Sequence, residues 1–307
     1  GRFFPDHFTV TAAGAVVPAC VPPGPAVSYT YLGENFAISG VTVEARNAGD
    51  VKTIYYDGSF AQHAPATFST WGFGARDTLA ALDLSSRITG GTVSGTWTNG
   101  ALASDFSGIK INRAAAPDGP LTSVVLGIAI ADPDGVALQP GALNLNVDGA
   151  GGDDHKQLGG PGEFRFGRLR MQNALASSGA IALPVPMETQ YWSGTLFVLN
   201  SDDSCTTLPA ANVGLSDYRL NLNAPETAVT PTPDITFTGG RGDLKLSPPG
   251  AANNGSVLVT PDLAAAGRPY LQGAWTGATY TENPSARASF GLFGSQPRNF
   301  IFQRENY

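Results

Sequence analysis

The segment EFRFGRLRMQNALASSGAIALPVPMETQYWSGTLFVLNSDDSC, residues 163–205, carries the strongest strand pattern in the chain. Phe164 and Phe166 share one face, and the same alternation resumes at Leu169 after a slip at Gly167. A period of two with one glycine slip predicts a half-buried strand that contains a bulge. This stretch therefore predicts a β-rich module, and by itself it indicates no chemistry.

Two prolines interrupt the next strand pattern. Leu183, Val185 and Met187 alternate with Pro184 and Pro186. Proline has no N–H group to donate to a ladder, so this pattern predicts an edge strand or an extended segment beside one.

Composition extends this reading to the whole chain. The 307 residues include 38 glycines and 23 prolines, which favours many short strands and turns over long helices. Residues 76–87 show helical spacing, and we expect a short helix there, with a single helical turn at 260–267. We predict an all-β fold of two tandem β-sandwich domains with short helical turns only, and strand–turn–strand rhythm makes the first domain immunoglobulin-like. The expected boundaries are an immunoglobulin-like sandwich at 1–135, a Gly/Asp-rich connector at 136–160 and a second sandwich at 161–307.

Charge and hydropathy exclude several classes of partner. The formal net charge is −7, which argues against non-specific binding to nucleic acid or to an anionic membrane. No apolar run reaches 18 residues, so we expect no membrane-spanning segment, and the longest run, 124–131, predicts a buried strand. The chain starts at Gly1 without a charged and apolar leader, so we expect any signal peptide to be removed or to lie upstream.

Two cysteines, Cys20 and Cys205, lie far apart in the sequence. They are either free and buried, or joined in one disulfide. The Gly/Pro-rich β composition is typical of extracellular proteins and favours the disulfide.

Catalytic signals are weak. The histidines His7, His63 and His155 are scattered, and none has a partner at metal-ligand spacing. We predict no catalytic residues and no enzyme. A hydrolase with an unrecognised site would require a cleft that gathers His63 or His155 with carboxylates. The adjacent Asp202 and Asp203 are interpreted as a solvated turn or as a counter-charge for the arginines at 165–170.

Calcium is the one cofactor that the residue pattern suggests. Oxygen-bearing side chains stand at alternate positions before glycine turns, which can aim several of them at one ion. The alternative is ordinary Asp/Gly turns. The candidate ligands are Asp132, Asp134, Asn144, Asn146, Asp148, Asp153 and Asp154.

Aromatic residues and strand edges offer other binding surfaces. The aromatic side chains either pack on the sheets or form a platform for sugars. Exposed strand edges can accept a strand from a partner. No single set of binding residues is indicated. The aromatic candidates are Tyr29, Tyr31, Tyr55, Tyr56, Trp71, Phe73, Tyr191 and Trp192.

A series of motifs along the chain resembles the C-terminal region of MshQ-like proteins, which are encoded with the mannose-sensitive haemagglutinin (MSHA) type IV pilus of Gram-negative bacteria. The resemblance spans essentially the whole chain. The motifs are GRFFPDHF at 1–8, YTYLGENF at 29–36, DPDGV at 132–136, FGRLRMQN at 166–173, LPVP at 183–186, QYW at 190–192, DDSC at 202–205, PSARASFG at 284–291 and QRENY at 303–307.

The resemblance implies a secreted protein of the bacterial cell surface, linked to a pilus and without assigned catalytic residues. It also supports the disulfide, since Cys20 and Cys205 both lie in motif segments. We therefore expect a non-enzymatic extracellular structural or adhesive component of a type IV pilus or another cell-surface assembly. Its expected partners are pilus or cell-surface proteins, with a carbohydrate-binding adhesin module as the alternative.

Overall fold

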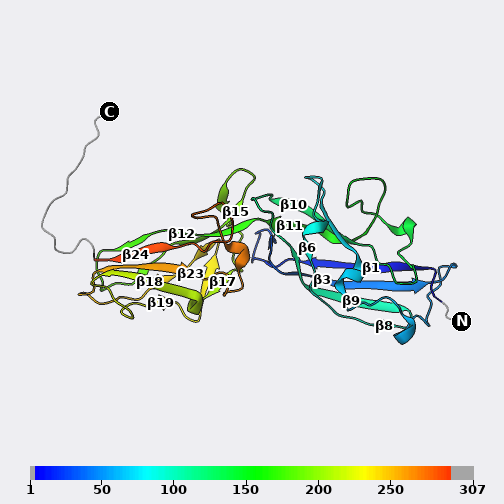
Figure 1. Cartoon of the computed structure of the whole chain (residues 1–307), viewed down its shortest axis with the longest axis horizontal. Coiled ribbons are helices and arrows are strands. Elements are labelled where there is room, and N and C mark those ends of the chain that lie inside the picture. Colours follow the sequence, from blue (N-terminus) through cyan, green and yellow to red (C-terminus); the bar gives the residue numbers. More distant parts are fainter. Residues whose placement is uncertain (1–3, 292–307) are drawn as a thin grey trace, which may run out of the picture.

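The computed structural model of the chain describes residues 4–291. It is a rod of two β domains placed end to end, in which β1 (His7–Val17) starts near one end and β24 (Ala286–Phe290) ends near the other (Figure 1). This confirms the predicted all-β class. Among the described residues the helices are single 3₁₀ turns, at Gly58–Phe60, Phe68–Trp71, Ser85–Arg87, Pro140–Ala142, Ala210–Asn212 and Pro269–Leu271.

Two expected elements have different outcomes. The helix expected at 76–87 is wrong, because this segment ends a strand at Asp77, forms a two-residue strand at Leu82–Asp83 and then a 3₁₀ turn. The buried strand expected at 124–131 is confirmed by β10 (Leu121–Ile128), whose last five residues are all buried. The QRENY motif lies outside the described residues.

The first domain packs two sheets face to face. One has the order β1-β3-β9-β6, with β7 and β8 also paired to β9, and the other has the order β2-β11-β10-β4-β5. The remaining bounds are β2 (Thr30–Tyr31), β3 (Phe36–Arg46), β4 (Phe73–Asp77), β5 (Leu82–Asp83), β6 (Ile88–Thr89), β7 (Thr92–Val93), β8 (Trp97–Thr98), β9 (Ala101–Ile111) and β11 (Lys156–Arg165).

This strand order is that of an immunoglobulin domain. In the usual lettering, β1, β3 and β9 with the short strands β6 to β8 form the A-B-E-D sheet. Strands β4, β10 and β11 form the C-F-G sheet. The short strand β2 runs parallel to the last strand, β11. The immunoglobulin-like architecture expected for the first domain is thus present.

The second domain has the same topology. Its sheets have the orders β12-β15-β21-β20-β17 with β16 on β15, β13-β24-β23-β18, and β14-β22-β19. The bounds are β12 (Gly167–Met171), β13 (Ala174–Ala176), β14 (Leu183–Pro184), β15 (Met187–Trp192), β16 (Phe197–Leu199), β17 (Thr207–Pro209), β18 (Val213–Leu220), β19 (Val229–Thr230), β20 (Asp234–Thr238), β21 (Arg241–Gly242), β22 (Lys245–Leu246) and β23 (Gly255–Pro261).

Strands β12, β15, β21 and β20 again read A-B-E-D, and β18, β23 and β24 read C-F-G. The three-stranded sheet continues the B, E and D strands past short breaks, and β13 runs parallel to β24 as β2 does to β11. The two domains are therefore structural repeats, although no repeat is visible in their sequences.

The prolines of the second domain break a strand instead of marking an edge. Pro186 separates β14, at the edge of the three-stranded sheet, from β15, which lies between β12 and β21. The edge position that the prolines predict is correct for β14 and wrong for β15.

The segment 136–160, expected to be a connector, belongs to the first domain. Val136 and Leu138 are buried in the first core, and Leu145 and Val147 pack with Val125 in a small cluster beside it. Strand β11 then begins at Lys156. The many glycines and aspartates of this segment concealed a few well-spaced apolar anchors, and these decide its position.

The glycine slip of the quoted segment marks the boundary between the domains. Strand β11 ends at Arg165 and β12 begins at Gly167, so Phe166 is the only residue between them. The pattern predicted one bulged strand of the second domain, whereas the structure divides it between two domains. A Cβ atom at Gly167 would lie 2.5 Å from the ring of Tyr31, so glycine is required for the close approach of that ring.

Candidate functional site: the interdomain joint

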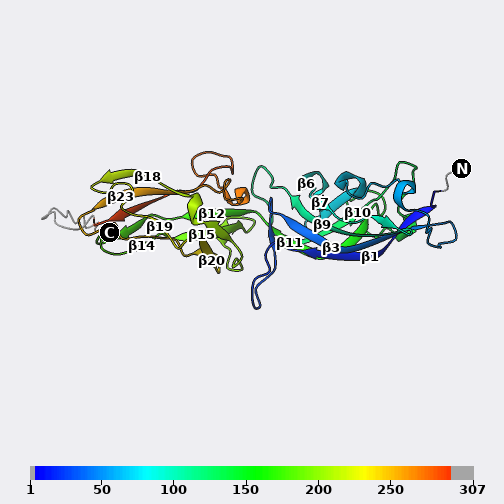
Figure 2. The ribbon, with the colours of Figure 1, turned by 90° about the horizontal axis from the view of Figure 1, so that it is seen from below.

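Three structures connect the domains, and we call them together the joint. The first is the direct passage from β11 to β12 through Phe166. The second is the loop between β1 and β2, residues 18–29, which projects from the middle of the rod (Figure 2). The third is the contact of residues 268–282 with Glu34 and Arg113 of the first domain.

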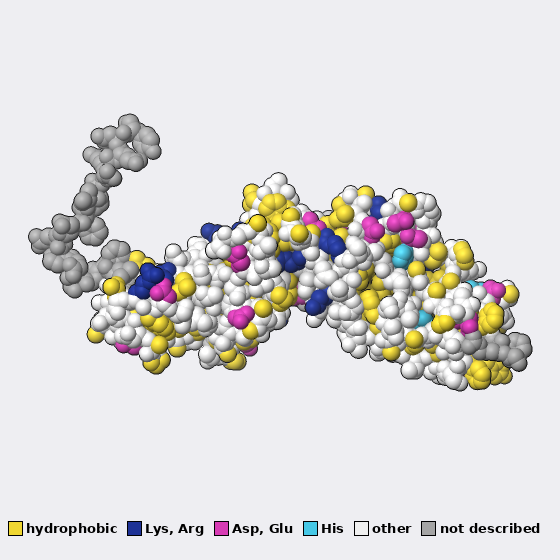
Figure 3. Space-filling model, in the orientation of Figure 1, with side chains coloured by type: hydrophobic (Ala, Val, Ile, Leu, Met, Phe, Trp, Pro, Cys, Tyr) yellow, Lys and Arg dark blue, Asp and Glu magenta, His cyan; other side chains and the backbone are white. Residues whose placement is uncertain are grey.

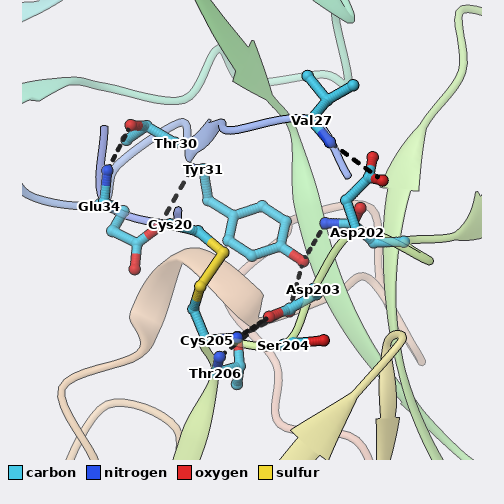
Figure 4. The surroundings of a disulfide bond; sticks show 12 residues. Cys20, Val27, Thr30, Tyr31, Glu34, Asp202, Asp203, Ser204, Cys205 and Thr206 are labelled. Carbon is cyan, nitrogen blue, oxygen red and sulfur yellow. Dashed lines mark hydrogen bonds between the residues drawn. A yellow bond between two sulfur atoms is a disulfide. The ribbon is translucent and has the colours of Figure 1, made fainter. Parts of the chain in front are cut away.

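The loop between β1 and β2 is tied covalently to the second domain. Cys20 and Cys205 form a disulfide with a sequence separation of 185 residues and a Cα–Cα distance of 5.6 Å (Figure 4). This confirms the predicted bond. In the chain-entropy description, closing so long a loop stabilises the folded state by about 5 kcal/mol. Such a bond indicates an oxidising compartment outside the cytoplasm.

A buried polar network lies beside the disulfide (Figure 4). The Tyr31 hydroxyl of the first domain donates to Asp203 Oδ2 at 2.9 Å and accepts from Asn200 Nδ2 at 2.6 Å. Asp203 is fully buried, and it also accepts from the backbone N–H and the hydroxyl of Thr206. Because each buried polar group has a partner in the other domain or in its own turn, separating the domains would leave several of them unsatisfied.

Arg165 is the charged centre of the joint. Its guanidinium pairs with Glu163 at 2.6 Å and with Asp202 at 2.8 Å, and it also donates to Asn200 Oδ1. The same group lies over the Tyr29 ring, 4.5 Å from its centroid. Of the two readings left open for the aspartate pair, Asp202 is therefore a counter-charge for the arginine run.

The apolar packing of the joint is reciprocal. Tyr29 and Tyr31 come from the first domain but are buried in the second core, where Tyr31 stacks on Tyr270 at 5.7 Å. In the opposite direction, Phe166 and Tyr280 pack in or against the first core. Each core is thus completed by side chains of the other domain.

The titratable groups of the joint are suited to hydrogen bonding. Tyr270 donates to Glu34 Oε1 at 2.6 Å. Burial raises the pKa of the Glu34 carboxyl above its usual range, and burial raises the pKa values of the Tyr31 and Tyr270 hydroxyls even more strongly. The tyrosines therefore keep their protons and act as fixed donors.

Several of the seven candidate calcium ligands accept hydrogen bonds from the protein itself. Asp132 is buried and accepts from the Tyr56 hydroxyl and from two backbone N–H groups of its own turn. Four of the candidates, Asn144, Asn146, Asp148 and Asp154, accept backbone N–H groups of their own loop or of β11. Within residues 4–291, no three His, Cys, Asp or Glu side chains gather in a way that could hold a metal ion. The seven calcium-ligand candidates are Asp132, Asp134, Asn144, Asn146, Asp148, Asp153 and Asp154.

The histidines weighed for a hydrolase lie apart from one another. His63 is buried among aromatic rings, accepts a hydrogen bond from Trp97 Nε1 and contacts the Thr70 hydroxyl. His155 pairs with its neighbour Asp154 at 2.8 Å. Neither lies at the joint.

Half of the eight aromatic candidates for a sugar platform are core residues. Tyr29, Tyr31, Tyr56 and Trp71 are fully or almost fully buried, whereas Tyr55 is 81% exposed. Phe73, Tyr191 and Trp192 are half-buried.

The joint contains functional residues that the sequence did not indicate. Tyr31, Asn200 and Asp203 come together from positions about 170 residues apart. Arg113 and Glu34 likewise carried no local signal. The available signs were the basic run at 165–170 beside the acidic turn at 202–203, and the motif segments 29–36 and 202–205, none of which indicated that these residues meet.

We expect Tyr31→Phe to lower the free energy of unfolding by about 1–3 kcal/mol, because it leaves the buried Asn200 Nδ2 without its acceptor and removes one of the donors to the buried Asp203 carboxylate. Tyr191→Phe is the matched control, since within the described residues its hydroxyl forms no hydrogen bond, and the change is expected to cost less than about 0.5 kcal/mol. Denaturant unfolding of both variants measures this. Equal stability of the two variants would contradict the role given to Tyr31.

Burial lowers the pKa of His63 from 6.5 to about 4, so the unfolded chain binds a proton at a higher pH than the folded chain. The stability gained by keeping His63 neutral is complete above pH 6.5 and is lost as pH falls toward 4, by up to about 1.4 kcal/mol per pH unit. Thermal unfolding between pH 7 and 4 is expected to show a steeper loss for the wild type than for His63→Gln. Parallel curves would rule out this contribution.

Comparison with known proteins places both domains in one family. Residues 1–157 match the family model described as DUF6701, third domain, and residues 165–306 match DUF6701, fourth domain. A search of curated proteins finds none that matches the chain. Among the described residues, no helix has the length and apolarity needed to cross a membrane. The chain belongs to the DUF6701 family, and the joint connects the third and fourth domains of that family.

Proposed function

We propose that this chain is a non-enzymatic, load-bearing stalk segment of an extracellular structural or adhesive assembly. The observation that carries the proposal is the joint. One residue separates β11 from β12, and a disulfide links the domains a second time. Tandem domains usually move relative to one another unless their interface is large and apolar. Reciprocal burial of aromatic residues and a double connection favour a rod that holds its shape.

The position of the disulfide determines the path of tension along the rod. Force applied at the ends of the described chain passes along β1 to Cys20, crosses to Cys205, and continues through β17 to β24. The residues between the cysteines, which include β2 to β16, lie off this covalent path while the bond is intact. This bypass protects most of the first domain and part of the second.

Family and compartment support a surface role. The family models assign the two domains consecutive ordinals, third and fourth, which fits a series of domains. The disulfide fits an oxidising environment. The resemblance to MshQ-like proteins adds the pilus-associated setting, so we assign the stalk to a type IV pilus or a related cell-surface assembly.

The partner is tested by capture. We expect the immobilised full chain to retain pilins encoded in the same locus from a bacterial surface extract. The control is an unrelated tandem immunoglobulin-like protein of similar size. If pilins are retained equally by both columns, or by neither column, the pilus assignment is contradicted. The mechanical role would not be affected by that result.

The mechanical role is tested by pulling single molecules from their termini. The 185 residues between the cysteines correspond to roughly 610–670 Å of extended chain at about 3.3–3.6 Å per residue. We expect full extension of the oxidised chain to be shorter than that of the reduced chain by about this length. Reductant should have no effect on a Cys20→Ser/Cys205→Ser variant. Equal extension of the oxidised and reduced chains would contradict the bypass.

A further inference from the structure

A groove of about 540 Å³ lies along the joint and is lined by both domains. Most of its lining residues have polar side chains, and these come from both domains. The first domain contributes Lys110, Asn112 and Arg113, and the second contributes Tyr270, Gln272, Thr279, Tyr280 and Thr281. A groove of this size accommodates a small-molecule ligand or a short segment of a polymer.

Arg113 is a fixed cation without an acidic partner. Its guanidinium donates to the backbone carbonyls of Pro269, Gln272 and Tyr280, at 3.1–3.4 Å. It lies 4.0 Å from the centroid of the Phe166 ring. The described residues place no carboxylate in an ion pair with it, and its Nε is buried without a hydrogen-bond partner. Burial lowers the pKa of Arg113 to about 10, which leaves it charged at neutral pH.

The charge of the groove is opposite to that of the chain. The lining contains two cationic side chains, Lys110 and Arg113, and no carboxylate, although the whole chain has a net charge of −7. Lys and Arg side chains gather around the waist between the domains (Figure 3). A cation that is partly withdrawn from water without a counter-ion is costly, and an anionic ligand would offset that cost.

The other lining groups favour a saccharide over a peptide. Asn112 and Gln272 use their amide nitrogens on neighbouring residues, which leaves the amide oxygens to accept hydrogen bonds from hydroxyl groups. Thr279 adds a hydroxyl at the exposed rim. The half-buried Tyr280 ring provides an apolar surface against which the C–H face of a sugar packs. We propose that this groove binds an anionic saccharide, whose carboxylate is held by Arg113 and Lys110.

Binding is tested on the intact, oxidised chain with oligomers of galacturonate, glucuronate and mannuronate. At least one is expected to bind, more weakly as salt is added, and its methyl-esterified counterpart is expected to bind at least tenfold more weakly. In NMR spectra, the side-chain amide signals of Asn112 and Gln272 should shift on titration with the acid.

Two variants test whether the positive charge of Lys110 contributes to binding. Lys110→Gln removes one cation without touching the contacts of Arg113 and is expected to weaken binding by threefold to tenfold. Lys52→Gln, at an exposed site elsewhere in the first domain, should leave binding unchanged. The proposal is overturned if none of the three acids binds, if acid and ester bind equally, or if hexaglutamate binds as tightly as the best acid.

Discussion

The close approach of Tyr31 to the start of β12 is the constraint on which the rest of the structure depends. Gly167 has no side chain, so the ring can lie against the backbone where the second domain begins. The hydroxyl of that ring then reaches Asp203 and Asn200. A residue of the first domain thereby becomes part of the second core, beside a disulfide that fixes the loop before β2.

The joint combines interactions that differ in kind. The disulfide acts mainly by restricting the unfolded chain, whereas the polar network penalises separation of the folded domains. Arg165 contributes both charge pairing and stacking, because its guanidinium contacts two carboxylates and the Tyr29 ring. Buried ion pairs add little stability relative to apolar packing, but they fix geometry because a displaced charge would lack a partner. We interpret this mixture as selection for a defined angle between the domains.

The sequence predicted the class of fold and much of the covalent framework. A long apolar run identified β10, and a period-two pattern identified the strands on either side of Gly167. Distant cysteines in a Gly/Pro-rich chain favoured the disulfide. The domain boundaries were harder to predict from the sequence. The pattern at 163–171 is continuous, and only the three-dimensional structure shows that a domain ends inside it. The apolar anchors at 136–147 were hidden because Gly/Asp turns dominate the composition of that segment.

The joint was not predictable for a physical reason. Its contacts connect residues that are far apart in sequence, such as Tyr31 with Asp203 and Glu34 with Tyr270. No local periodicity records such pairings, and a buried aspartate in a DDSC turn looks the same in sequence as a solvated one. The second immunoglobulin-like topology was hidden for a related reason. Its B, D and E strands are broken into short pieces, and only their pairing restores the order.

The central claim is that the two domains form one rigid body. Residual dipolar couplings measured for backbone amides of both domains in the oxidised, full-length chain test it most directly. The account predicts that the two domains report a single alignment tensor, with the same magnitude and orientation in the frame of the structure. Two tensors that differ in magnitude or orientation would show that the domains move independently, and would contradict it.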